Sequence, residues 1–323
     1  MAQIDSLFKM MRDRGASDLH LVVGRPPMLR TRGDMVETDN EKLTPSSAES
    51  LIREILSKAQ NEQVDEHLDL DFAYELPGVA RFRANVLHQH RGLGAVFRII
   101  PTEIMTLDDL GMPPAVRKLS EIPAGLVLVV GPTGSGKSTM LAGMINHINE
   151  TRAAHILTIE DPLEFIHPPK KCLITQREVG EHTENFASAL RVAGRQDPDI
   201  ILVGEMRDLE TISLALTSAA CGLLVFGTLH TNSAIKTVDR IIDVFPTNQQ
   251  QQVRTQLAFV LEGVLSQTLL RRRDGKGRVL ALEIMVPNTA IRALIRDAKV
   301  HQLYSQMQMG QDKYGMQTMN QCL

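Results

Sequence analysis

The sequence has few cysteines, and their placement excludes a disulfide framework. Its 323 residues include 3 cysteines, Cys172, Cys221 and Cys322, none in a CxxC spacing. An odd number of widely separated cysteines is typical of reduced thiols in a cytoplasmic protein, and not of a secreted domain or a zinc site. We therefore expect a cytoplasmic chain without structural disulfides.

Long apolar runs are also missing. The longest uninterrupted ones, such as residues 126 to 130 and 200 to 203, fall far short of the roughly 20 residues that cross a bilayer. The N-terminal segment MAQIDSLFKMMRDRG carries Asp5 and Lys9 where a signal peptide would have its apolar core. We expect no export signal and no membrane span, so that contact with a membrane would be made through partners.

Neither the charge nor the aromatic content suits a nucleic-acid-binding protein. The chain has 35 Lys and Arg against 38 Asp and Glu, a net charge of -3, with 9 Phe, 3 Tyr and no Trp. No global positive field attracts phosphates, and the aromatic residues are not interleaved with basic ones. The sequence therefore disfavours a nucleic-acid partner.

What is present is an ordinary globular composition, 43% hydrophobic and 23% charged, long enough for about two domains. The first hundred residues mix an expected helix over residues 3 to 14, another over residues 46 to 63, and alternating strands in DLDFAYEL and ARFRANVLHQHRGLGAVFRII. Turn residues after Pro101, in TEIMTLDDLGMPP, predict a linker at residues 101 to 114. We expect an α+β domain over residues 1 to 104 and a second domain over residues 105 to 323.

The second domain alternates buried strands with helices. Short apolar runs at residues 126 to 130, 156 to 159, 200 to 203 and 223 to 226 are separated by helical stretches. This order predicts an α/β core with a mostly parallel sheet covered on both faces. From about Gln249 we expect mostly helices with one strand at VLALEIM, and a C-terminal helical region from about residue 286.

The segment GPTGSGKST directly follows the first of these strands and matches the phosphate-binding loop G-x-x-x-x-G-K-[ST]. Its glycines allow successive N–H groups to turn toward phosphate oxygens at a helix N-terminus. Lys137 would contact the β- and γ-phosphates, and Ser138 would bind Mg²⁺. The expected nucleotide-binding residues are Gly131, Thr133, Gly134, Ser135, Gly136, Lys137, Ser138 and Thr139.

Polar residues follow three more of the strands, at the sheet edge where ligands bind. In DPDIILVGEMRD we expect Glu205 to be the Walker B acid, because Asp197 and Asp199 precede the strand. TIEDPLEFIH places Glu160, Asp161 and Glu164 in one turn, where one acid, with Glu164 preferred, would orient or deprotonate water and another would hold metal. His230 follows the fourth strand and could sense the γ-phosphate. The expected metal-binding residues are Ser138, Glu160 and Glu205.

Together these segments resemble the secretion-type ATPases, and their wording is similar to the PilT-like type IV pilus retraction ATPases. The resemblance runs from ASDLHL through VARFRANV, GPTGSGKST, TIEDPLEFIH and VFGTLHT to AIRALIR and HQLYSQMQMGQ. It implies a PAS-like N-terminal domain, a RecA-like P-loop core with C-terminal helices, and ATP and Mg²⁺ as cofactors. It also implies a homohexamer in which ATP lies between the two domains of each subunit.

The resemblance assigns roles to six catalytic candidates: Glu164 in the acidic box, Glu205 in Walker B, His230 in the histidine box, and Arg81, Arg83 and Arg98 as arginines that reach the nucleotide on domain closure. It implies that ATP hydrolysis drives pilus retraction through an inner-membrane platform protein of the pilus machinery. The ATPase would be cytoplasmic and peripheral at the inner membrane through these partners. The segment AIRALIR resembles a C-terminal motif associated with retraction.

The chain departs from the family pattern at Ala220, Leu223 and Gln196, where the family has an acid, a second histidine and an acid. These departures keep a second reading open, an ATP-binding ring subunit with little hydrolysis that assists a paralogous retraction ATPase. An extension-type motor is disfavoured because the chain lacks a paired-cysteine zinc element. A small-molecule kinase is disfavoured because no acceptor pocket or basic lid is evident.

Overall fold

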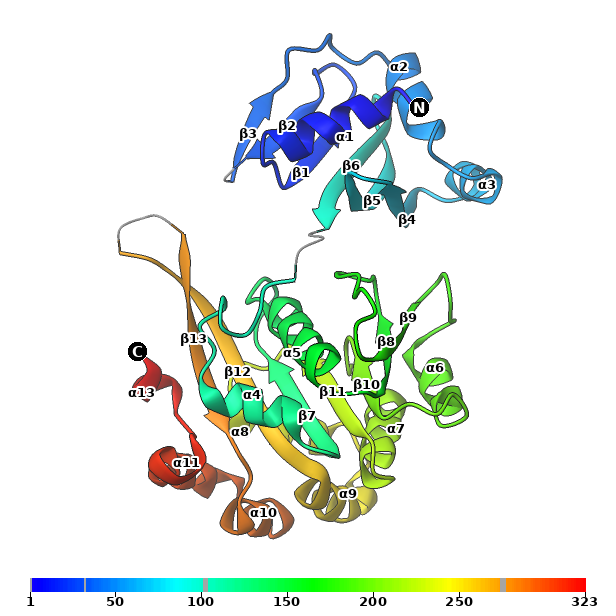
Figure 1. Ribbon diagram of the computed structural model, residues 1–323. Coiled ribbons are helices and arrows are strands. Elements are labelled where there is room, and N and C mark those ends of the chain that lie inside the picture. The colour runs from blue at the N-terminus through cyan, green and yellow to red at the C-terminus, as the bar shows by residue number, and fades with distance from the viewer. Residues whose placement is uncertain (1, 32, 101–103, 274–276) are drawn as a thin grey trace. The chain divides into compact units, whose positions relative to one another are not determined.

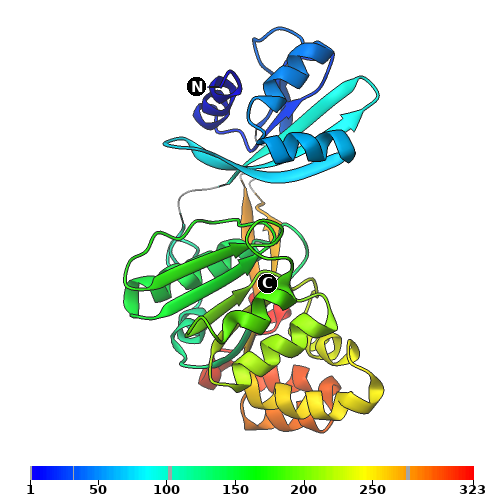
Figure 2. The ribbon, with the colours of Figure 1, turned by 90° about the vertical axis from the view of Figure 1, so that its right-hand side faces the viewer.

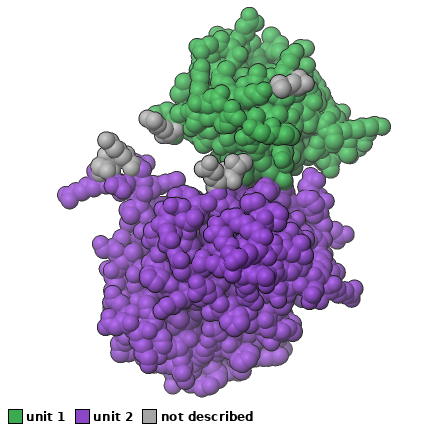
Figure 3. All heavy atoms as spheres, viewed as in Figure 1, with its two compact units in different colours: residues 1–103 green, residues 104–323 purple. Residues whose placement is uncertain are grey.

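The computed structural model describes residues 2–31, 33–100, 104–273 and 277–323. The chain divides into two compact units, unit 1 (Met1–Glu103) and unit 2 (Ile104–Leu323) (Figure 3). Of the linker expected at residues 101 to 114, residues 101–103 lie outside the described residues. Each unit has its own sheet and its own hydrophobic core.

Unit 1 is built on a six-stranded antiparallel sheet in the order β3-β2-β1-β6-β5-β4 (Figure 1). Buried side chains alternate along the long strands, so that Phe82 and Phe97 point into the core. There they meet Phe8 of the first helix, whose ring stacks on Phe82 at 4.2 Å. The elements are α1 (Ile4–Asp13), β1 (Asp18–Leu21), β2 (Met28–Thr31), β3 (Asp34–Glu37), α2 (Pro45–Arg53), α3 (Lys58–Glu66), β4 (Asp69–Leu76), β5 (Ala80–Gln89) and β6 (Gly92–Ile100).

The single helix expected over residues 46 to 63 is wrong, because two helices occupy this region. Helix α2 ends at Arg53, and α3 begins after Ser57, whose hydroxyl accepts from the Gln60 N–H while the Gln60 side chain accepts from the Ser57 N–H. This reciprocal capping satisfies N–H donors that have no carbonyl partner at the start of a helix. A local polar interaction therefore overrides the continuous helical periodicity.

Unit 2 has a seven-stranded sheet in the order β13-β12-β7-β11-β10-β8-β9, in which only β12 and β13 pair antiparallel. The mostly parallel α/β core that the sequence predicts is confirmed. Its elements up to the last strands are α4 (Pro114–Glu121), β7 (Gly125–Val130), α5 (Lys137–Thr151), β8 (His155–Glu160), β9 (Leu173–Glu178), α6 (Phe186–Ala193), β10 (Ile200–Val203), α7 (Leu209–Ala220), β11 (Leu224–Leu229), α8 (Ala234–Asp243) and α9 (Thr247–Val260).

Helices cover both faces of this sheet (Figure 1; Figure 2). Along β7, Leu126 and Leu128 face one core with residues of α6 to α9, whereas Val127 and Val129 face a second core with residues of α4 and α5. All six residues of β7 are buried. A strand buried on both faces explains the continuous apolar run in the sequence.

The region from Gln249 onward is less helical than expected, because β12 (Leu261–Arg271) pairs parallel with β7 and antiparallel with β13 (Arg278–Met285). Strand β9 was likewise not foreseen. Gly263 lets β12 pass α4, since an added Cβ would lie 2.6 Å from a methyl group of Leu119. Helices do follow β13: α10 (Thr289–Arg296), α11 (Leu303–Met309), α12 (Gln311–Tyr314) and α13 (Met319–Cys322).

Among the helices that the described residues form, none has the length and apolar character needed to cross a membrane.

Candidate nucleotide-binding site

The phosphate-binding loop connects the buried strand β7 to helix α5. Gly134 and Gly136 have φ angles of 76° and 91°, a region in which side chains with a Cβ are strained. Gly136 is the N-cap residue of α5. The loop curls around the ammonium group of Lys137, which donates to the carbonyl oxygens of Gly131 at 2.9 Å and Pro132 at 3.2 Å.

Lys137 lies in an electrostatic environment set by two acids from other elements. Its burial lowers the pKa of the ammonium group, and the negative charges of Glu205 and Glu164 act in the opposite direction. Strands β7, β8 and β10 run parallel, and Lys137, Glu164 and Glu205 follow their carboxyl ends, so the three residues lie at one edge of the sheet.

Glu205 follows the end of β10, one residue after Gly204. An added Cβ on Gly204 would lie 3.1 Å from both Glu160 Cα and the Ile159 carbonyl oxygen, so glycine allows β10 to end directly beside β8. The Gly204 N–H donates to the Ile159 carbonyl at 2.8 Å. This close approach sets Gly204 beside Glu160, so that Glu205 leaves β10 at the end of β8.

The carboxylate of Glu205 is 17% exposed and has two neighbouring side chains, His230 and Arg207. Its Oε1 atom lies 2.9 Å from His230 Nε2 and forms an ion pair with Arg207. This contact raises the pKa of the Arg207 guanidinium. Sequence analysis missed Arg207, although its place two residues after Glu205 in the strand exit is a usable signal.

The acids that precede β10 lie at the other end of the strand. Asp199 accepts a hydrogen bond from the His155 N–H at 2.8 Å, at the start of β8. This contact joins the beginnings of two strands and places Asp199 far along the sheet from Glu205. The choice of Glu205 over Asp197 and Asp199 agrees with the strand direction.

Glu160 ends β8 and is half-buried, with its Oε1 atom fully buried. Burial raises its pKa to about 7, and its Oε1 atom has no hydrogen-bond partner among the described residues. A buried carboxyl oxygen without a partner suits a hard cation such as Mg²⁺, which prefers oxygen ligands. Within the described part of the chain, no three His, Cys, Asp or Glu side chains form a metal cluster, so a cation there would depend also on Ser138 and on phosphate oxygens.

Glu164 is exposed and lies on a loop that is hydrogen-bonded to a side chain of strand β9. Gln176 of β9 donates to the Phe165 carbonyl at 2.9 Å and accepts from the His167 N–H at 2.9 Å. Leu163 and Phe165 are buried on either side of Glu164. The two side-chain bonds of Gln176 therefore hold the acidic turn, a role that sequence analysis missed because it missed β9.

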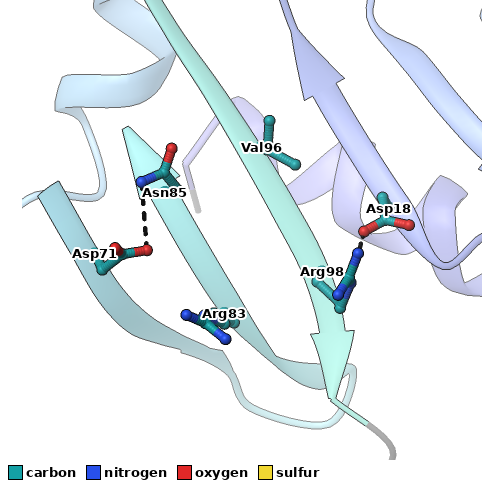
Figure 4. A pocket seen from close by; sticks show the side chains of 6 residues that line it. All are labelled: Asp18, Asp71, Arg83, Asn85, Val96 and Arg98. Carbon is teal, nitrogen blue, oxygen red and sulfur yellow. Dashed lines mark hydrogen bonds and ion pairs between the residues drawn. The ribbon is translucent and has the colours of Figure 1, made fainter. Parts of the chain in front are cut away.

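The three candidate arginines lie on strands of unit 1. Arg83 of β5 is the direct cross-strand partner of Arg98 of β6, and Arg81 is two residues before Arg83 on the same face. The Arg98 Nε donates to a carboxylate oxygen of Asp18 at 2.8 Å. Burial acts to raise the pKa of Asp18, but hydrogen bonds from Ser17 and Arg98 outweigh it and the pKa is lowered. A pocket of about 200 Å³ opens on this face (Figure 4), lined by Asp18, Asp71, Arg83, Asn85, Val96 and Arg98. A contact of these arginines with nucleotide stays a prediction.

Comparisons with known proteins show the family to which the chain belongs. The family described as type II/IV secretion system protein matches residues 2–321. The type IV pilus retraction ATPase PilT of Pseudomonas aeruginosa is 53% identical over 320 residues, which cover 99% of this chain and 92% of that protein. The type IV pilus ATPase PilU of the same organism is 37% identical over 321 residues, covering 99% and 84%.

A solved structure shows the same fold. The crystal structure of the pilus retraction motor PilT with bound ADP is 49% identical and superimposes with a TM-score of 0.93, covering 100% of this chain and 92% of that one. Similarity over the whole chain includes both units and every segment that carries a candidate site residue.

Proposed function

The chain belongs to the type II/IV secretion system protein family and is an ATPase, and on that premise we propose that it couples ATP hydrolysis to the retraction of a type IV pilus. The observation that carries the proposal is that Lys137, Glu164 and Glu205 follow the carboxyl ends of the parallel strands β7, β8 and β10, at one edge of the sheet. The 53% identity to a pilus retraction ATPase supports retraction as the work done.

In the proposed mechanism, the phosphates of ATP enter the loop between residues 131 and 139, where N–H groups at the start of α5 attract anions. Lys137 exchanges its bonds to the loop carbonyls for bonds to the β- and γ-phosphates. Glu205 holds the attacking water, and Glu164 accepts its proton. Ser138, Glu160 and Glu205 would supply oxygen ligands for Mg²⁺, which would neutralise charge on the phosphates.

The arginines of unit 1 complete the proposed site when the two units close on the nucleotide. Arginine at a transferring phosphoryl group accelerates the reaction by about 10³- to 10⁵-fold, because it stabilises the charge of the transition state. We further propose a cytoplasmic homohexamer in which unit 1 of one subunit packs on unit 2 of its neighbour. Successive closure would drive a platform protein of the pilus machinery at the inner membrane.

A second candidate function is an ATP-binding ring subunit that hydrolyses little and assists a paralogous motor. Leu223, in place of a box histidine, packs against the apolar core of unit 2 and directly precedes β11, so it lies at the start of that strand and away from His230 at its end. Ala220 nearby is equally without a charge. His230 does contact Glu205, which favours the active motor.

The test is steady-state phosphate release from Mg·ATP, measured beside particle mass, for the wild type and Glu205→Ala. We expect a hexamer whose turnover falls at least ~100-fold in the variant while ATP binding persists, because the group that positions water is lost. Glu210→Gln, an exposed acid of α7, is the matched control and should retain turnover. Nucleotide binding without turnover in the wild type would instead support the assisting subunit.

A further inference from the structure

Strand β12 runs alongside the phosphate-binding loop and places a buried glutamine against it. Its residues Leu265 and Ser266 pair with Val129 and Val130, the last two residues of β7 before the loop. The next residue, Gln267, is 1% exposed. Its Nε2 atom donates to the Ser135 carbonyl oxygen at 2.6 Å, joining residues 132 positions apart.

Two glycines of the loop are needed for this contact. A Cβ on Gly131 would collide with the backbone carbonyl oxygen of Gln267 and would lie 2.6 Å from Ser135 Oγ. A Cβ on Gly136 would lie 3.1 Å from Gln267 Nε2. The absence of side chains at these two glycines therefore leaves room for β12 to pack against the loop, in addition to allowing the loop to bind phosphate.

The orientation of one peptide follows from the bond to Gln267. A trans peptide is planar, with its carbonyl and N–H groups pointing in opposite directions. Because the Ser135 carbonyl points to Gln267, the Gly136 N–H of the same peptide points away from β12. This N–H belongs to the helix N-terminus at which phosphate binds.

Some of the buried polar atoms at this contact have no hydrogen-bond partner within the described residues. These atoms are Gln267 Oε1 and Ser135 Oγ. An apolar side chain of the same size would avoid the penalty of a buried, unpaired amide oxygen. A glutamine at this place is thus explained by what its N–H group does to the loop and not by packing.

We propose that Gln267 is a positioning residue that holds the phosphate-binding loop in the shape that receives nucleotide. This inference rests on the proposed function, since it concerns the same ATP site. It ties β12, and through it the β12–β13 hairpin, to nucleotide affinity. Gln267 acts through the loop backbone and need not touch the nucleotide.

The first test compares Gln267→Met with Gln317→Met by calorimetric titration with ADP and by thermal unfolding. Gln317 is a matched control, because its Nε2 donates to the Leu282 carbonyl at 2.6 Å in another part of unit 2. We expect ADP affinity to fall about tenfold, or about 1.4 kcal/mol, in Gln267→Met alone. Equal affinity in the two variants would overturn the proposal.

A second variant separates positioning from packing. Gln267→Glu keeps the shape but carries a donor only when its carboxyl group is protonated, which burial favours. We expect its ADP affinity, relative to wild type, to recover as the pH falls from 8.5 to 6. A ratio that does not change with pH would contradict the assigned hydrogen bond. A wild type that binds ADP but does not hydrolyse ATP would count against the proposed function and leave this inference standing.

Discussion

Replacing Gly204 by alanine tests whether the close approach of β10 and β8 sets the catalytic geometry. The added Cβ would lie 3.1 Å from Glu160 Cα and from the Ile159 carbonyl oxygen, and both are backbone atoms that cannot rotate away. Overpacking of this kind costs about 1 to 3 kcal/mol. The end of β10 must shift by a few tenths of an ångström, and Glu205 shifts with it.

Two measurements follow from this displacement. For a unit of this size, each kcal/mol lowers the unfolding midpoint by about 2 to 4 °C, so differential scanning calorimetry should detect a fall of several degrees. ATP turnover should fall at least ~10-fold, because small misplacements of a catalytic group are costly. Calorimetry suits this chain, which has no tryptophan for fluorescence.

Gly194→Ala is the control. Its Cβ would have no atom within 4 Å, and the backbone φ of -61° suits alanine. The lower chain entropy of the unfolded state should make this variant equal to wild type or more stable by about 0.4 to 1 kcal/mol. The reasoning fails if Gly204→Ala matches Gly194→Ala in both midpoint and turnover.

Two further predictions concern buried charges. Burial raises the pKa of Glu160 to about 7 from its usual 4.5, so the folded state binds the proton more tightly, and stability should fall by up to about 3 kcal/mol as the pH rises from 4.5 to 7. Glu160→Gln cannot titrate and should not lose this stability; parallel pH profiles in calorimetry would refute the assignment. Asp18→Asn, which removes the charged partner of Arg98, should destabilise unit 1 by about 1 to 3 kcal/mol in urea unfolding followed by circular dichroism. Glu37→Gln breaks the exposed pair with Arg25 and should change stability by no more than about 1 kcal/mol; equal effects would contradict the role given to burial.

The sequence predicted an element correctly wherever the pattern within one short segment was sufficient to identify it. The loop at residues 131 to 139 follows a strand and begins a helix, as the motif requires. Strand β10 occupies the residues that its apolar run predicts, and Glu205 follows it. Apolar runs of this kind identify strands, because a strand buried on both faces must be apolar throughout.

Strands β9 and β12 were harder to foresee, because their sequences mix polar and apolar residues. Four of the six residues of β9 are half-buried, and β12 ends in exposed residues. Their strand conformation is decided by pairing with β8 and with β7. Pairing with a strand elsewhere in the sequence does not by itself create a hydrophobic periodicity in β9 or β12.

The sequence by itself determined the nucleotide loop, the alternation of strands β7, β8, β10 and β11 with helices, and the acids that follow the strand ends, because each depends on neighbours along the chain. Only the tertiary structure decided which side chains support them. Gln267 reaches Ser135 and Gln176 holds the turn of Glu164, while the sheet register sets Arg83 opposite Arg98. These contacts join segments that hydrogen bonding and burial bring together only after the chain has folded.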